Sequence, residues 1–92
     1  MNTTQPALPA LAATRCWMEG RRVYLEITAR RSISFPTSKF DRLAYAPQVE
    51  LEKLRLNQEG RAVRWDTLDL EILVEDVAHQ RYVVAASSAV VG

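Results

Sequence analysis

Basic and aromatic residues alternate in the first third of the chain, a combination that binds nucleic acid or protein. Trp17 and Tyr24 stand among arginines, and aromatic rings flanked by cations can stack on the bases of single-stranded nucleic acid. Glu19 and Glu26 are interspersed with these arginines and would repel phosphates. We therefore predict contact with a protein partner or, as the less favoured alternative, with nucleic acid. The predicted contact residues are Arg21, Arg22, Tyr24, Arg30 and Arg31.

Residue types that perform catalysis are scarce in this sequence. His79 is the only histidine and Cys16 the only cysteine, so a zinc site built on thiolates is excluded. His79 falls near the end of a predicted helix, where a cation suits the negative end of the helix dipole. Three glycines form no phosphate-binding loop. We predict no catalytic, metal-binding or cofactor-binding residue, and a protein that is not an enzyme.

Acidic residues gather late in the chain and could suggest a cation site. Asp66 and Asp69 have a simpler role, because they are placed to cap and to stabilise the start of a helix. We therefore interpret the group as structural. Its members are Asp66, Asp69, Glu71, Glu75 and Asp76.

Length and charge indicate one small domain. The chain has 92 residues and a net charge of +1, which gives no case for a polyanion binder. Residues 1–46 carry seven basic and three acidic residues, and residues 47–92 carry five basic and eight acidic residues. A single cysteine fits a reducing compartment. The first residues lack Lys and Arg and contain Pro6 and Pro9, so we expect no signal peptide and a cytoplasmic protein without a membrane anchor.

The first half of the domain reads as three strands. We predict strands at 14–18, 21–28 and 32–35, with a tight turn at Gly20. Val23, Leu25 and Ile27 alternate with polar residues, which is the pattern of an antiparallel strand with one buried face. Pro36 ends the third strand because it has no N–H to donate.

The second half reads as a helix, a hairpin and a second helix. Ser38 is a good N-cap for a short helix that Pro47 ends. Residues 49–57 are open to two interpretations, a bulged strand or, as we favour, a turn to Glu50 followed by a later strand. A hairpin at 58–60 leads to a strand at 61–65 with Trp65 facing the core. A second helix then begins at Asp66 or Thr67. Its predicted apolar stripe is Leu70, Leu73, Val74 and Val77.

These elements predict an α+β domain in which a small, mostly antiparallel sheet packs against a C-terminal helix. We place this domain at residues 13–80, with a flexible arm at 1–12 and a tail at 81–92. The stretch 82–91 carries no charge and is rich in Val and Ala, so we expect it to add as a strand to a second copy or to a partner. The predicted partner contacts in this tail are Tyr82, Val83 and Val84.

The order of several short motifs resembles a known family, bacterial domain-of-unknown-function family 2442. The resemblance covers about residues 13–78. Family members usually have a histidine before the tryptophan and a proline after it, where this chain has Arg64 and Asp66. Leu70 and Leu73 replace an acid and a serine. The motifs that carry the resemblance are Gly20-Arg21-Arg22, Ile33-Ser34-Phe35-Pro36, Phe40-Asp41-Arg42-Leu43, Ala46-Pro47 and the run from Gly60 to Asp69.

The resemblance implies a small α+β fold without known catalysis or cofactor. Many relatives are encoded beside another small protein, in pairs that look like toxin and antitoxin. We therefore expect a regulatory module that binds and masks a small, toxin-like protein. The alternatives are a nucleic-acid-binding accessory protein and a structural subunit of a larger assembly, and a homo-oligomer is compatible with each.

Overall fold

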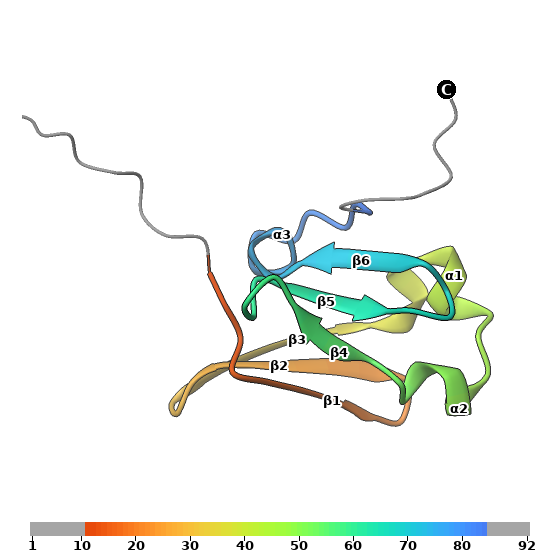
Figure 1. Ribbon diagram of the computed structural model, residues 1–92, viewed down its shortest axis with the longest axis horizontal. Coiled ribbons are helices and arrows are strands. Elements are labelled where there is room, and N and C mark those ends of the chain that lie inside the picture. The colour runs from red at the N-terminus through yellow and green to blue at the C-terminus, as the bar shows by residue number, and fades with distance from the viewer. Residues whose placement is uncertain (1–10, 85–92) are drawn as a thin grey trace, which may run out of the picture.

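The computed structural model describes residues 11–84, which form two three-stranded antiparallel sheets joined by short helices (Figure 1). The predicted α+β class is therefore confirmed. In both sheets, strands that are consecutive in sequence are neighbours. The first sheet contains β1 (Arg15–Glu19), β2 (Arg22–Thr28) and β3 (Arg31–Pro36), and the second contains β4 (Arg55–Asn57), β5 (Ala62–Trp65) and β6 (Leu70–Leu73). The short helices are η1 (Thr37–Lys39), α1 (Asp41–Ala44), α2 (Gln48–Leu51) and α3 (Val74–Ala78).

The core lies between the inner faces of the two sheets. Alternation along β2 buries Val23 and Leu25, and Phe35, the cross-strand partner of Val23, is buried with them. Strand β5 contributes Val63 and Trp65 from the opposite side. The sheets approach each other where β1 contacts β4, as Figure 1 shows.

Trp65 is the largest fully buried side chain, which confirms its predicted place in the core. Its indole N–H donates a hydrogen bond of 2.9 Å to the carbonyl of Leu51 at the end of α2. This bond satisfies the one polar atom that the ring carries into the core.

The prediction of a helix beginning at Asp66 or Thr67 is wrong. Residues 66–69 form a turn in which Asp69 adopts a φ of 50° and donates its N–H to the Asp66 carbonyl. Leu70 and Ile72 then continue as strand β6, paired with Trp65 and Val63. The helix α3 begins only at Val74, with Val74 and Val77 buried and Leu73 half-buried before it. This short apolar run matches both the helical spacing and the strand spacing of apolar residues, and its pairing with β5 makes it a strand.

The region predicted as the first helix forms two separate elements, the 3-10 turn η1 and the short helix α1. Ser38 lies within the 3-10 turn η1, and Phe40 occupies the N-cap position of α1 without a side-chain cap bond. The favoured interpretation of residues 49–57 is confirmed, because a helical turn ends at Leu51 and the strand begins at Arg55. Within residues 11–84 no helix is long and apolar enough to cross a membrane.

The N-terminal segment joins the two sheets before β1 begins. Ala13 donates its N–H to the Gly60 carbonyl at 2.7 Å, and Thr14 donates to Glu26. Leu11 packs on the core. Gly60 has a φ of 88°, and a Cβ at this position would lie 2.4 Å from the Ala13 carbonyl oxygen.

Replacing Gly60 by alanine should therefore destabilise the domain strongly. The alanine Cβ would clash with backbone and would also enforce a conformation that costs an L-residue energy, so we expect a loss of about 3 kcal/mol. Gly20→Ala is the matched control, because Gly20 has a φ of 59° but nothing within 4 Å of the place that an alanine Cβ would occupy. It should lose only about 1 kcal/mol. Urea unfolding measures both, and equal losses would show that the Ala13 contact does not constrain the fold.

Candidate partner-binding surface

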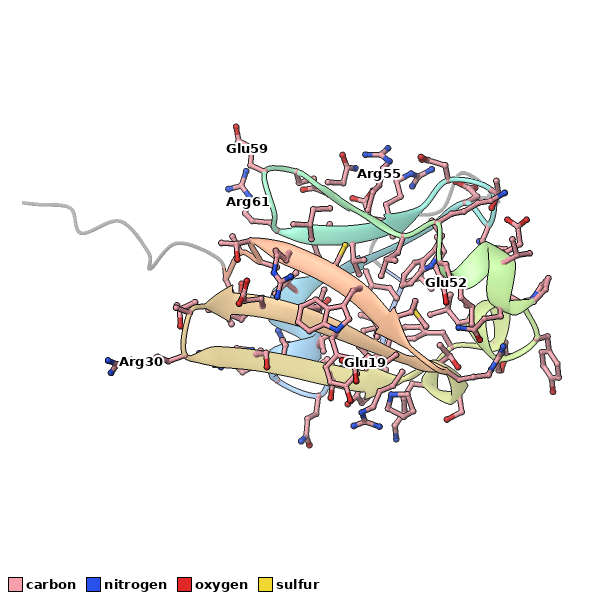
Figure 2. The ribbon with its side chains drawn as sticks, turned by 90° about the horizontal axis from the view of Figure 1, so that it is seen from below. Glu19, Arg30, Glu52, Arg55, Glu59 and Arg61 are labelled. Atoms are coloured by element: carbon pink, nitrogen blue, oxygen red, sulfur yellow. The ribbon has the colours of Figure 1, made fainter. Side chains whose placement is uncertain are left out.

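The outer face of the first sheet carries the aromatic and arginine side chains that the sequence indicated. The residues alternating with the buried set on β1–β3 point away from the core. Figure 2 views this sheet from its outer side, with Glu19 on it, and no other described segment crosses in front. We call this surface the aromatic face. It consists of Arg15, Trp17, Glu19, Arg22, Tyr24, Glu26, Ser32 and Ser34.

A stacked aromatic pair occupies the centre of the aromatic face. Trp17 and Tyr24 are cross-strand partners, and their rings lie 5.6 Å apart with an angle of 12° between the planes. The Arg15 guanidinium lies 4.6 Å from the Trp17 ring centre, and the indole N–H donates to Glu19 at 3.0 Å. Both rings are half-buried by these neighbours. The result is an ordered aromatic surface that needs little further side-chain ordering to bind a partner.

Charges on the aromatic face are balanced. Arg15 pairs with Glu26 at 2.9 Å, and its hydrogen bond lowers the pKa of the Glu26 carboxyl. Arg22 donates to the Ser34 hydroxyl at 3.0 Å. With Glu19, the face therefore carries two positive and two negative side chains. Such a pattern complements a mixed-charge protein surface better than a line of phosphates.

Arg21 is not part of this surface. Its guanidinium turns to the end of α1 and donates to the carbonyls of Leu43, Ala44 and Ala46, at 2.9–3.1 Å. These carbonyls are among the backbone acceptors that a helix end leaves without partners. Arg21 therefore has a structural role that its position in a basic run does not reveal.

The other predicted arginines lie on or beside the aromatic face. Arg22 and Tyr24 belong to it. Arg30 and Arg31 lie at the hairpin between β2 and β3, and Figure 2 shows Arg30 projecting from its tip. Both side chains are exposed, and neither forms an ion pair with another residue of the 11–84 segment. These two cations therefore extend the surface at one end of the sheet.

The predicted tail contacts divide into two groups. Tyr82 packs on its own domain, with its ring centre 6.3 Å from Phe35 and 6.0 Å from Phe40 and with Lys39 above it. This contact contradicts the expectation that Tyr82 belongs to a tail that orders on another chain. Val83 and Val84 are exposed. The rest of the predicted tail, 85–92, and most of the predicted arm lie outside the described residues.

Sequence reasoning missed one exposed apolar feature. Tyr45 is 87% exposed and Val49 is 64% exposed, and Pro47 between them is also exposed. The available signal was Tyr45 itself, an aromatic residue outside the apolar spacing of Phe40, Leu43 and Ala44.

Asp66, Asp69 and Glu71 bind arginines and do not cap a helix, whereas Glu75 and Asp76 lie in the first turn of α3. Asp66 forms two hydrogen bonds with Arg55, at 2.7 and 3.1 Å, and one with Arg64 at 2.8 Å. Arg64 also pairs with Asp69 and with the buried Glu71. The expected capping role of Asp66 and Asp69 is wrong, because these residues lie in the turn before β6 and α3 begins only at Val74. No group of three acids, histidines or cysteines in the described part of the chain is arranged to hold a metal ion.

Cys16 and His79 have no partner group for nucleophilic catalysis among the described residues. Cys16 is half-buried against the core, and burial raises the pKa of its thiol, which disfavours the reactive thiolate. His79 is the residue that follows α3, and its backbone N–H donates to carbonyls of Glu75 and Asp76.

The fold and this surface define a class, a small α+β domain of two three-stranded antiparallel sheets, one of which exposes an aromatic outer face. Residues 17–82 match the family model described as a protein of unknown function, DUF2442, and the chain belongs to this family. A crystal structure of a protein of unknown function from Rhodospirillum rubrum ATCC 11170 shares the fold, with a TM-score of 0.72 and 17% identity over 80% of this chain and 92% of that chain. No curated protein matches the sequence.

Arg21→Ala should destabilise the domain by about 2 kcal/mol, because it leaves carbonyls at the end of α1 without their charged donor. Arg30→Ala, at an exposed position, should change the free energy of unfolding by less than about 0.5 kcal/mol. Urea unfolding of both variants tests the division between structural and surface arginines. A loss for Arg30→Ala as large as that for Arg21→Ala would contradict it.

Acid should weaken the domain through the Asp66 cluster. Hydrogen bonds from Arg55 and then Arg64 lower the pKa of Asp66 from 3.8 to about 2. Burial alone would raise the pKa of Glu71, but hydrogen bonds from Asn57, Gln58 and Arg64 lower it overall. A lowered folded-state pKa stabilises the fold above the unfolded-state pKa, and this stabilisation is lost as pH falls through the folded-state value.

Between pH 4 and pH 2 the free energy of unfolding should therefore fall, and Asp66→Asn should fall less steeply over the same window because its side chain cannot titrate. Urea titrations at several pH values measure the two slopes. Parallel curves for the variant and the wild type would show that Asp66 does not contribute to acid sensitivity.

Proposed function

We propose that this protein is a non-catalytic, cytoplasmic protein-binding module, and that the aromatic face is its docking surface. The observation that supports this most directly is the Trp17–Tyr24 stack with Arg15 above it, on a sheet face that no other described segment covers. Tryptophan, tyrosine and arginine are the residues most enriched where protein interfaces concentrate their binding energy.

A protein partner fits this face better than nucleic acid. A base that stacked on Trp17 would have to compete with the Arg15 guanidinium and with Tyr24. Glu19 and Glu26 would also lie beside the phosphates that accompany the base. A protein surface with charges of both signs meets no such repulsion, because Arg15 and Glu26 can exchange partners across the interface.

The partner must extend beyond the aromatic face. Strands are about 4.8 Å apart and rise about 3.4 Å per residue, so three strands of about six residues cover roughly 300 Å² of flat surface. A stable interface usually buries about 800 Å² on each partner. The exposed Arg30 and Arg31 at the adjoining hairpin are the neighbouring groups best placed to enlarge the contact.

Masking of a small toxin-like protein is the form of binding that we favour. The family resemblance motivates it, because many relatives are encoded beside a second small protein. A small domain can block an active surface with one sheet face and needs no catalytic group to do so. The aromatic stack would then supply affinity, and the Arg30–Arg31 hairpin would orient the partner on approach.

The test begins with a partner purified with the tagged full chain from the native host and then produced separately. Trp17→Ala and Arg15→Ala should each weaken its affinity at least about tenfold, measured by calorimetry. Glu59→Ala, on the other hairpin and 89% exposed at its side chain, is the control and should bind like the wild type. Moderate salt should reduce the affinity only slightly.

Two results would contradict the proposal. In one, every variant of the aromatic face binds the purified partner as tightly as the wild type. In the other, a single-stranded oligonucleotide binds saturably, with an affinity that falls steeply with salt and is lost in Trp17→Ala. The second result would assign the same face to nucleic acid.

A further inference from the structure

The outer edge of β3 is the one strand edge that the described part of the chain leaves open. Each sheet has two edge strands, and β1 and β4 lie against each other where the sheets meet. The edge of β6 is covered, because Leu70, Glu71 and Ile72 are at most 5% exposed. Figure 2 shows β3 at the margin of the first sheet, with no described strand beyond it. Such an edge presents unpaired N–H and C=O groups that another extended chain can bind.

Two serines direct their backbone groups out of this edge. The Thr37 N–H donates to the Arg21 carbonyl at 3.0 Å, at the position that continues the pairing of β3 with β2. Bonded and non-bonded pairs alternate in an antiparallel ladder, so the odd-numbered residues of β3 bond β2 and the even-numbered ones turn away from it. Ser32 and Ser34 therefore point their N–H and C=O groups outward. These groups form no hydrogen bond within residues 11–84, and Ser32 is exposed.

The two ends of this edge are positively charged. Residues 27–40 contain three basic and no acidic side chains. Arg30 and Arg31 lie at the hairpin where β3 begins, and Lys39 lies in η1, which follows the strand. All three are exposed, and none forms an ion pair with a described residue. An acidic strand complements this edge, whereas a second copy of the same edge is repelled by it.

The two sides of the edge differ in polarity. Ile33 is half-buried and packs at the rim of the core, so an apolar side chain placed beside it by an added strand would extend the core. On the opposite side, Arg22 is exposed and donates to the Ser34 hydroxyl at 3.0 Å, without a carboxylate partner among the described residues. Successive side chains of a strand alternate between these two sides. The edge therefore suits a strand in which apolar and acidic residues alternate.

We propose that β3 binds an extended acidic segment of the partner protein, which pairs with it as an additional strand of the first sheet. Main-chain hydrogen bonds to Ser32 and Ser34 supply much of the affinity, and carboxylates near Arg22, Arg30 and Arg31 fix the position of the segment. This inference rests on the proposed function in one respect, namely that the chain binds a protein, and it specifies which part of that protein is recognised. The added strand also contributes contact area beside the aromatic face, which is too small for a stable interface by itself.

Capped peptides of about eight residues, the length that spans β3, serve as probes. One peptide alternates valine and glutamate, and its matched control alternates valine and lysine. Nuclear magnetic resonance of the isotope-labelled full chain follows the binding of each. The glutamate peptide should bind saturably, with an affinity at least about tenfold higher than that of the lysine peptide. Hydrogen exchange of the Ser32 and Ser34 amides should slow when the glutamate peptide is bound, because their N–H groups become hydrogen-bonded.

A proline on the edge tests the main-chain contact directly. Ser34→Pro removes the outward N–H and leaves the bonds between β2 and β3 in place, since an edge strand tolerates proline where its N–H faces solvent. Ser34→Ala is the matched control, because it keeps this N–H. Ser34→Pro should weaken binding of the glutamate peptide at least about fivefold, whereas Ser34→Ala should bind it like the wild type.

Charge reversal tests the same edge without changing its backbone. Arg30→Glu combined with Arg31→Glu should abolish the preference for the glutamate peptide, and circular dichroism checks that every variant is folded. Trp17 lies on β1, at the other side of the sheet, so Trp17→Ala should bind the glutamate peptide like the wild type. Loss of the edge contact and loss of the aromatic face can therefore be distinguished.

A glutamate peptide that does not bind saturably, a lysine peptide that binds as tightly, or a folded Ser34→Pro variant that binds like the wild type would each overturn the proposal. Self-association of the wild type that Ser34→Pro abolishes would assign the edge to a second copy instead. A host partner that requires Trp17 but not the Ser34 N–H would leave the aromatic face as the docking surface and remove the edge from it.

Discussion

The burial of Trp65 is the interaction on which the rest of the structure depends. A domain of this size has a small core, and the Trp65 indole is the largest side chain that is fully buried in it. The ring reaches from β5 across to the end of α2, where the Leu51 carbonyl accepts its N–H. That single bond fixes how the α2 segment sits on the second sheet. Because β4 begins shortly after α2, it also fixes where the second sheet starts.

The α1–α2 segment is held from the other side by the first hairpin. Arg21 donates to three carbonyls around the end of α1, and Gln48 donates to the Gly20 carbonyl at 2.6 Å. These bonds substitute for regular structure in a stretch that has only two short helical turns. Tyr45 follows α1 and Val49 lies within α2, and both side chains remain exposed, whereas Ala46 between the two turns is buried.

The sequence predicts the first sheet well because its signals agree. Val23, Leu25 and Ile27 alternate strictly, Gly20 permits the tight turn, and Pro36 ends the last strand. The second sheet is harder to predict from the sequence, because Leu70 and Ile72 match strand spacing while Leu70, Leu73 and Val74 match helical spacing. Only the tertiary pairing of Ile72 with Val63 selects the strand.

The residues of the candidate surface likewise fall into those that the sequence predicts and those that it does not. Alternation alone assigns Arg22 and Tyr24 to an outer face, whereas Arg21 is drawn to carbonyls more than twenty positions later in the chain. Composition places Tyr82 in a tail, yet it packs on Phe35 and Phe40 because the end of α3 returns the chain across β3.

The outer side of the second sheet is held together by a network of arginine and carboxylate pairs. Arg64 and Asp66, on either side of Trp65, bind each other at 2.8 Å. Asp66 also binds Arg55 on β4, and Arg64 reaches Glu71 on β6, so this pair links all three strands. Removing one member would leave a charge without its main partner, whereas the members of the intact network satisfy one another. Trp65 lies on the inner face of the same strand, so the core and the charged network occupy opposite faces of β5.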